Sequence, residues 1–192
     1  DAAEAMRPMI GPETFVVPMQ NGVETPGQLI SVLGEKAVVV GLGGLVSYIV
    51  EPGHIIHAGG EPFVSFGESD DSATERTRRL LQAFQNAGVN ADIPSNIHAA
   101  LWGKLAFMAA NSGVGAITRV PSGQWRRLAG SWEMAQQVVK EVLAVASAKG
   151  IDMPGDAFSS TIARLEGSPQ DGTSSMQRDL MDGKPSELEV QS

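Results

Sequence analysis

The sequence contains no cysteine, and its charged residues are mostly acidic. Without cysteine the chain can form no disulfide and has no thiol for nucleophilic catalysis. Its formal net charge of -8 argues against nucleic acid or an anionic membrane as a partner, because those surfaces are bound by clustered basic side chains. A small molecule, an anionic one included, is the partner that this composition leaves open.

Long hydrophobic runs are also missing. The longest apolar stretch, residues 37–50, contains three glycines and is shorter than the ~20 residues that a membrane-spanning helix needs. No signal peptide is recognisable at the start of the chain. With 42% hydrophobic residues in a length of 192, the chain can bury a sizeable core. We therefore expect a globular protein of the cytoplasm.

Histidine is scarce, and the three histidines are dispersed. His54 and His57 are three residues apart in an expected strand, which places them on opposite faces, and His98 is distant in sequence. This spacing predicts no metal site. No Gly-x-Ser-x-Gly elbow is present to indicate a hydrolase.

The character of the chain changes near residue 94. Before this point, runs rich in β-branched and aromatic residues alternate with helical patterns and are bounded by Gly and Pro. The expected strands are TFVVPM, KAVVVGLGGLVSYIV, HIIHAGG and PFVSFGE. After this point the pattern is helical almost throughout. The sequence therefore predicts an α/β region over 1–94 and an all-α region over 95–192.

The helix expected after the last of these strands has a start signal and an apolar stripe. Ser72 and Glu75 have the spacing of a capping box. Leu80, Leu81 and Phe84 then fall on one helical face. This pattern predicts an amphipathic helix that begins after Ser72.

Two further helices are predicted in the second region. Ser131 is a candidate cap for a helix over 132–149, and another helix is expected over 156–166. The apolar stripe of the first follows the i, i+3, i+4, i+7 spacing through Ala135, Val138, Val139, Val142 and Ala146. This stripe could cover a core or a subunit interface.

The glycine-rich segment GLGGL is a candidate dinucleotide-binding turn, and it fails the test. After Gly41 and Gly43 the third position of the fingerprint falls on Val46. The residues that follow have the pattern of a strand, whereas the fingerprint requires a helix whose N-terminus meets the pyrophosphate. We expect these glycines to let a strand bend or pack closely.

The segment VPMQNGVETP combines an apolar run with a sharp turn. Val16, Val17 and Met19 are typical of the end of a buried strand, and Asn21-Gly22 is a turn signal. By itself the pattern favours a plain turn former at Asn21. In α/β folds, however, ligands bind where strands end, so the segment is also a candidate binding site.

Lys104 is the residue most suggestive of chemistry. A helix is expected from the candidate cap Ser95, with an apolar face through Leu101, Leu105 and Met108, and Lys104 lies within it after Trp102-Gly103. One interpretation is a lysine whose stem covers apolar surface while its charge reaches solvent. The other is a partly desolvated ammonium that can give up a proton near neutral pH.

Several segments together resemble the ketopantoate reductase (2-dehydropantoate 2-reductase) family. Their order and spacing run from near the first residue to the last. The segments are MQNGVE, HAGG with VSFGE, LWGKLAF, GAITRVPSG, ASAKGIDMP and SSMQRDLMDGKPSELE.

The resemblance implies a fold and a reaction. It implies the latter part of a Rossmann-type NADPH-binding domain over 1–94 and a 6-phosphogluconate-dehydrogenase-like helical domain over 95–192. In this family, Lys104 would donate a proton to the ketone oxygen of a 2-oxo acid as hydride arrives from NADPH. Glu187 in PSELE matches the family's acid that bonds the substrate and helps to hold the lysine.

The resemblance also assigns three binding residues. Ser175 matches a substrate-binding serine, Ser112 stands where a substrate-contacting asparagine is common, and Asn21 matches an asparagine at the nicotinamide end of the cleft. Apart from the resemblance, Ser175 is equally explained as a helix cap and Glu187 as a solvated acid of a first helical turn. Met108 departs from the family pattern, which often has asparagine there, so the exact oxo acid is left open.

The chain begins with Asp1 and stops within helical sequence, so we expect a fragment that lacks the family's Gly-rich NADPH loop and is inactive by itself. For the whole protein the resemblance implies reduction of 2-dehydropantoate to pantoate in pantothenate biosynthesis. The alternatives are a related NAD(P)-dependent 2-oxo or hydroxy acid reductase, or a non-catalytic helical assembly module. A homodimer is compatible with the resemblance, and the choice between NADPH and NADH is not decided by this sequence.

Overall fold

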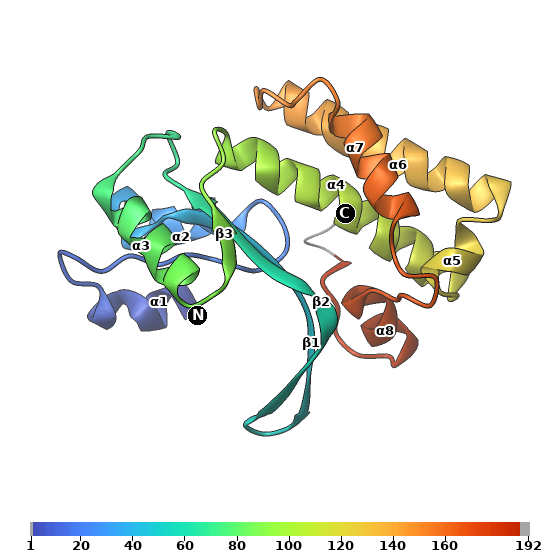
Figure 1. The fold of residues 1–192 in the computed structure, drawn as a ribbon, viewed down its shortest axis with the longest axis horizontal. Coiled ribbons are helices and arrows are strands. Elements are labelled where there is room, and N and C mark those ends of the chain that lie inside the picture. Colours follow the sequence, from blue (N-terminus) through green and yellow to red (C-terminus); the bar gives the residue numbers. More distant parts are fainter. Residues whose placement is uncertain (1, 189–192) are drawn as a thin grey trace. The chain divides into compact units, whose positions relative to one another are not determined.

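The computed structural model describes residues 2–188, which form two compact units (Figure 1). The first unit contains the described residues up to Gln20 together with Glu24–His98. The second contains Asn21–Val23 and the described residues from Ala99 onward. All strands of the described chain lie in the first unit, and the second is helical. The predicted order, a partial α/β sheet followed by a helical region, is confirmed.

The sheet of the first unit has the order β1-β2-β3. The strands β1 (Val40–Glu51) and β2 (His54–Gly67) pair antiparallel, and β3 (Asn90–Asp92) pairs parallel with β2. HIIHAGG and PFVSFGE, expected as two strands, form the single strand β2. The pairing of β1 with β2 changes register between Gly44 and Ser47. This irregularity in the ladder lets β2 continue as one strand through the glycine-containing segment between the two expected strands.

The segment TFVVPM is not a strand, contrary to expectation. It makes one isolated parallel bridge, in which the Val16 N–H donates to the Ala37 oxygen at 2.8 Å and the Val39 N–H donates to the Val16 oxygen at 3.0 Å. Pro18 has no N–H to continue this ladder. The chain then bends through Gly22, whose φ is +96°.

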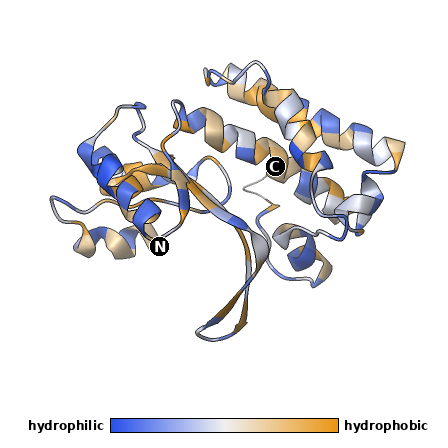
Figure 2. Ribbon diagram, in the orientation of Figure 1, coloured by the Kyte–Doolittle hydropathy of each residue, from blue (hydrophilic) through white to orange (hydrophobic). Residues whose placement is uncertain are grey.

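The far half of the β1–β2 hairpin is apolar and exposed (Figure 2). Each of six large side chains there is more than half exposed: Leu45, Val46, Tyr48, Ile49, Val50 and Ile55. At the other end of the hairpin, Val39, Val40 and Phe66 are fully buried. The core of the first unit therefore lies at the start of β1 and the end of β2.

The glycines of β1 serve close packing, as expected. A Cβ atom at Gly41 would lie 2.4 Å from Cγ1 of Val17, and one at Gly44 would lie 2.2 Å from the ring of Phe63. Both distances are below the closest approach of real Cβ atoms. The segment GLGGL lies in the paired strand β1, so its glycines serve packing rather than a phosphate-binding turn.

The helices of the first unit are short apart from α3. They are α1 (Ala2–Met6), the 3-10 turn η1 (Arg7–Met9), α2 (Thr25–Leu33), the 3-10 turn η2 (Glu35–Ala37) and α3 (Glu75–Asn86). The capping box predicted at Ser72 is wrong, because Thr74 is the N-cap of α3 and its Oγ1 accepts from the Thr77 N–H. The Ser72 N–H instead donates to Oδ1 of Asp70.

The helices of the second unit pack around one core, and the first of them begins two residues before that unit. They are α4 (Ile97–Thr118), α5 (Ser122–Trp125), α6 (Ala129–Ala148), α7 (Ala157–Glu166) and α8 (Ser175–Met181). The fully buried members of the core are Ala106, Ala110, Val114, Trp125, Ala135, Val139 and Leu165. Trp125 stacks on Trp132 at a ring distance of 6.3 Å. The small side chains of α4 let its neighbours approach closely.

The buried face of α4 differs from the predicted one. Leu101 is buried, but Leu105 and Met108 are only half-buried, and the core contacts come from Ala106 and Ala110. A helix rich in apolar residues on several faces gives no clear stripe, so periodicity alone could not select the face. The predicted cap at Ser95 is also wrong, because the first helical N–H, that of Ile97, donates to Oδ1 of Asp71 at 2.9 Å.

The stripe predicted for 132–149 is confirmed. Ala135, Val139 and Ala146 of α6 are fully buried, and the α6 stripe packs on the core rather than remaining open as a surface. The predicted cap Ser131 is wrong, since α6 begins at Ala129 and its N-cap Leu128 makes no side-chain cap. The helix expected over 156–166 is confirmed as α7, with Asp156 at its N-cap position.

The contact of α5 with the loop before α8 leaves no room for a side chain at Gly123. The Gly123 N–H donates to the Gln170 oxygen at 2.9 Å, and a Cβ there would lie 2.6 Å from that oxygen and 2.8 Å from the Gln170 Cα. We expect Gly123→Ala to lower the free energy of unfolding by roughly 1 to 3 kcal/mol in urea denaturation, because backbone atoms must move.

A matched control is Gly130→Ala in the first turn of α6, where an added Cβ meets nothing within 4 Å. We expect this variant to be neutral or stabilising by about 0.5 kcal/mol, from helix propensity alone. Equal effects of the two substitutions would contradict the packing proposed at Gly123.

Candidate active site

Lys104 projects from the middle of α4 and is half-buried. Burial lowers the pKa of its ammonium below the ordinary value of 10.5, and the positive charge of Arg164 lowers it further. The carboxylate of Glu187 acts in the opposite direction and raises the pKa of Lys104. The local structure thus supports the second interpretation of this lysine, a partly desolvated ammonium beside two other charges.

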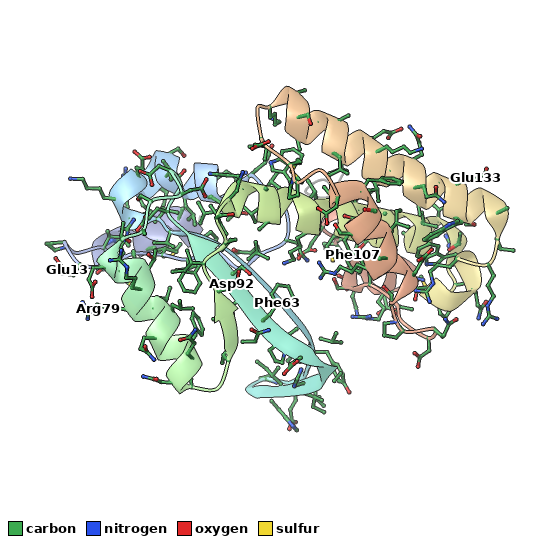
Figure 3. All side chains as sticks on the ribbon, turned by 45° about the horizontal axis from the view of Figure 1, so that its top comes forward. Glu13, Phe63, Arg79, Asp92, Phe107 and Glu133 are labelled. Carbon is green, nitrogen blue, oxygen red and sulfur yellow. The ribbon has the colours of Figure 1, made fainter. Side chains whose placement is uncertain are left out.

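Arg164 is a second positive charge near Lys104. It lies in the last turn of α7, and its guanidinium carbon stands 4.3 Å from the ring centroid of Phe107 on α4. Phe107 is labelled in Figure 3. The residue as a whole is exposed, yet partial burial of its head group lowers the pKa of Arg164. No sequence pattern singles out this arginine, because only the packing of α7 on α4 brings it to Lys104.

Asn21 and Glu187 meet although 166 positions separate them in sequence. The Asn21 Nδ2 donates a hydrogen bond of 2.9 Å to Oε2 of Glu187, and both residues are half-buried. Since Glu187 also acts on the charge of Lys104, one carboxylate links the turn at Asn21 with the lysine of α4. The structure therefore brings together three of the five predicted site residues.

Ser175 is the first residue of α8, and its side chain is exposed. The preceding Ser174, not Ser175, is the N-cap, and its Oγ accepts from the Gln177 N–H at 3.0 Å. Gln177 is buried and donates from Nε2 to the Val120 oxygen at 3.1 Å, which fixes α8 against the end of α4. The alternative explanation of Ser175 as the cap is wrong by one residue, and its hydroxyl is accessible to a ligand.

Ser112 lies two helical turns after Lys104 and is fully buried. Within residues 2–188, its Oγ is the only buried side-chain polar atom without a hydrogen-bond partner. A substrate role for Ser112 stays a prediction, and its burial gives that role no support.

The unpaired hydroxyl of Ser112 leads to a prediction about stability. Ser112→Ala removes a buried group that lacks a partner and improves helix propensity, so we expect about 1 kcal/mol of stabilisation in urea denaturation. The matched control is Ser122→Ala, because Ser122 is equally buried but its Oγ donates to the Pro169 oxygen at 2.5 Å. That control should be destabilising, and a large loss of stability in Ser112→Ala would contradict the prediction.

The histidines form no cluster in the part of the chain that the structure describes. His54 lies near Glu51, with 3.5 Å between Nδ1 and Oε1, and Nε2 of His98 is 3.0 Å from the Ser69 oxygen. Among residues 2–188 no group of three or more His, Asp or Glu side chains is placed to hold a metal ion. None of the described helices combines the length and apolarity that crossing a bilayer requires.

The described residues fit only one end of a nicotinamide dinucleotide. The glycines of GLGGL lie in the paired strand β1, and their space is taken by Val17 and Phe63, so this segment offers no phosphate cradle. At the other end, the side-chain amide of Asn21 can bond a nicotinamide carboxamide while Glu187 holds its orientation. The described residues therefore provide a side-chain amide at Asn21 and no pyrophosphate-binding turn in GLGGL.

The arrangement can transfer a proton and hold an anion. An ammonium of lowered pKa at Lys104 is a better acid than an ordinary lysine. Arg164 supplies a second positive charge at the same site, and Glu187 a carboxylate that can orient the lysine or a hydroxyl group. These groups suit a reaction in which negative charge develops on an oxygen next to another anionic group.

Two family profiles match the chain over most of its length. The profile described as ketopantoate reductase PanE/ApbA matches residues 1–71, and the profile described as its C-terminal part matches residues 96–192. The solved structure of a PanE/ApbA family ketopantoate reductase from Ralstonia eutropha is similar with a TM-score of 0.83 and 32% identity. That similarity covers 98% of this chain and 61% of the solved one.

Curated relatives show the same likeness over part of their length. A 2-dehydropantoate 2-reductase of Archaeoglobus fulgidus is 30% identical, over 77% of this chain and 50% of its own. An oxidoreductase of Bacillus subtilis, YkpB, is 26% identical over 96% of this chain and 61% of its own. The chain thus spans between half and about three fifths of the length of these relatives.

Proposed function

The chain belongs to the ketopantoate reductase family, and we propose that the whole protein reduces 2-dehydropantoate to pantoate with NADPH, a step of pantothenate biosynthesis. The observation that carries this proposal is the environment of Lys104. Its ammonium is half-buried, its pKa is lowered, and the charges of Arg164 and Glu187 both act on it. A lysine whose stem only covered apolar surface would not require the charged groups of Arg164 and Glu187 near its ammonium.

In the proposed reaction Lys104 is the general acid. When bound, the reduced nicotinamide supplies a hydride to the keto carbon. Lys104 donates its proton to the keto oxygen, so that the oxygen becomes a hydroxyl and no alkoxide has to persist in a partly desolvated site. The lysine leaves the step neutral and is protonated again from solvent. Burial favours this neutral form, which is the physical reason for the lowered pKa.

The other predicted residues take supporting roles in this proposal. Glu187 holds the ammonium of Lys104 and bonds a hydroxyl of the substrate. Asn21, fixed by its 2.9 Å bond to Glu187, contacts the nicotinamide end of the cofactor. Ser175, exposed at the start of α8, offers its hydroxyl to the substrate.

A second candidate is a reductase of another 2-oxo acid. Phe107 and Met108 follow Lys104 by three and four residues on α4, so they lie beside it on the helix surface. Neither side chain can bond the hydroxyl group that ketopantoate carries, whereas both would pack against an apolar chain. This observation favours a 2-oxo acid with a branched or aromatic side chain as the alternative substrate.

The deciding experiment is a substrate panel with the whole protein. NADPH oxidation is followed by absorbance with ketopantoate, 2-oxoisovalerate and phenylpyruvate, and each assay is repeated with NADH. Selective turnover of ketopantoate supports the first candidate, and selective turnover of the apolar acids supports the second. Absence of turnover with every oxo acid would reject both.

We also propose, from family membership, that the whole protein is a homodimer and is located in the cytoplasm. Light scattering coupled to size exclusion measures the mass of the whole protein directly. A monomer at assay concentrations would remove the dimer from the proposal without affecting the reaction.

A further inference from the structure

We propose that Arg164 binds the carboxylate of the 2-oxo acid and thereby holds its keto group against Lys104. The inference rests on the proposed function, because it names the residue that recognises the acid group of the substrate. The resemblance to the family assigned no role to this arginine.

The chemistry of a 2-oxo acid requires two donors side by side. The carboxylate carbon is bonded directly to the keto carbon, so the group that binds the carboxylate must lie next to the group that protonates the ketone. Arg164 lies close enough to Lys104 for its charge to act on the lysine. A substrate carboxylate beside both cations would offset their mutual repulsion, as the carboxylate of Glu187 already does in part for Lys104.

Arg164 packs on the aromatic ring of Phe107. With 4.3 Å from its Cζ to the ring centroid of Phe107, the planar group lies over the aromatic face. Phe107 is one helical turn from Lys104 on α4, so the stacked guanidinium stands at the level of the lysine. A guanidinium carries its N–H donors along its edge, in the plane in which it binds a carboxylate.

The backbone that carries Arg164 is anchored. Arg126 donates from Nη1 to the Leu165 oxygen at 2.6 Å and from Nη2 to the Ser168 oxygen at 2.9 Å, which binds the carboxyl end of α7. Leu165 is fully buried in the core of the second unit. The anchor limits the movement of α7, so that little ordering has to accompany substrate binding.

Arg164 is also accessible, as a binding residue must be. The residue is exposed, whereas partial burial of its head group strengthens its interaction with an anion relative to that of a fully solvated arginine. A lysine at this position could not replace it fully, since an ammonium neither stacks as a plane nor binds a carboxylate with two parallel hydrogen bonds.

The test compares an acid with its neutral ester. With the whole protein, kcat and KM are measured for 2-oxoisovalerate and for its methyl ester in the wild type, Arg164→Met and Arg164→Lys. We expect Arg164→Met to lower kcat/KM for the acid by about 100-fold, mostly through KM, because a charge-assisted hydrogen bond is lost. The ester should lose far less than the acid, because only the effect of Arg164 on the pKa of Lys104 is removed for it, and Arg164→Lys should be intermediate for the acid.

The control is Arg79→Met, which removes an exposed arginine of α3 in the first unit and should leave both kcat/KM values unchanged. An equal loss for acid and ester in Arg164→Met would overturn the inference, because it would indicate a structural role.

A second measurement separates this inference from the proposed function. Oxamate, a non-reacting analogue with the carboxylate of a 2-oxo acid, is titrated into the whole protein by calorimetry. We expect wild type to bind oxamate and Arg164→Met to bind it about 100-fold more weakly. If no oxo acid is reduced but this difference is found, the function fails and the carboxylate site stands. Unchanged or absent oxamate binding in both proteins would reject the site itself.

Discussion

Replacement of Lys104 by alanine is expected to lower turnover of the whole protein by about 100- to 10,000-fold, which is the range for loss of a general acid. The fold should survive, because Lys104 is only half-buried and is absent from the core of the second unit. The measurement is kcat with the best oxo acid of the panel, together with a far-UV circular dichroism melt. Near-normal turnover would remove the lysine from the reaction.

Two variants sharpen this prediction. Lys104→Arg keeps the positive charge but holds its proton too tightly to donate it, so it should be nearly as inactive as alanine. Lys149→Ala removes an exposed lysine at the end of α6 and should be fully active. Activity in Lys104→Arg would indicate that the charge, and not proton donation, is what the reaction needs.

The pH profile gives a further test with a definite sign. Reduction requires protonated Lys104, so kcat should fall as pH rises through the pKa of the lysine, which burial and Arg164 hold below 10.5. Glu187 raises this pKa, so Glu187→Gln should move the alkaline limb to lower pH. If the alkaline limb of the Glu187→Gln profile stays at the wild-type pH, the carboxylate of Glu187 does not affect the pKa of Lys104.

Arg76→Ala is expected to destabilise the first unit by roughly 3 kcal/mol, because it leaves the buried carboxylate of Glu68 without its partner. Arg76 donates from Nε to Oε1 of Glu68 at 2.7 Å and from Nη2 to Oε2 at 2.5 Å. Its Nη1 also donates to the Lys36 oxygen, and Thr74 donates to Oε1 at 2.5 Å. The side chain of Glu68 is 8% exposed.

The destabilisation caused by Arg76→Ala should depend on pH in a predictable direction. The hydrogen bonds from Arg76, assisted by the one from Thr74, lower the pKa of Glu68 below its ordinary value of 4.5. A carboxyl whose pKa is lowered in the folded state contributes stability above its unfolded pKa and loses it as pH falls through the folded pKa. The difference between wild type and Arg76→Ala should therefore be full at neutral pH and shrink on acidification below 4.5.

Urea denaturation at several pH values measures this difference, and the chain offers a matched control. Arg78 pairs with Glu75 at 3.7 Å on the same helix, but both side chains are more than half exposed. Arg78→Ala should cost less than about 0.5 kcal/mol, because solvent screens such pairs. Equal effects of Arg76→Ala and Arg78→Ala on the free energy of unfolding would show that burial of Glu68 does not strengthen its ion pair.

Local sequence determined the elements whose signals are unambiguous. The helix α6 was predicted because an apolar stripe with regular spacing can be satisfied by one packed face only, and Ala135, Val139 and Ala146 form that face. The packing role of Gly41 and Gly44 followed from the absence of a helix after them. The predicted helix caps are wrong. Several side chains near each helix start are equally suitable caps by sequence, and the geometry of the loops decides that Thr74 and Asp71 accept the N–H groups.

For the candidate site, the sequence by itself determined the residues that a resemblance can assign, Lys104, Glu187 and Asn21, and the absence of thiol chemistry. The tertiary structure decided what surrounds them. The bond between Asn21 and Glu187 joins positions 166 residues apart, and Arg164 reaches Lys104 only because α7 packs on α4. A pKa depends on burial and on neighbouring charges in space, and neither quantity is encoded in the spacing of residues along one helix.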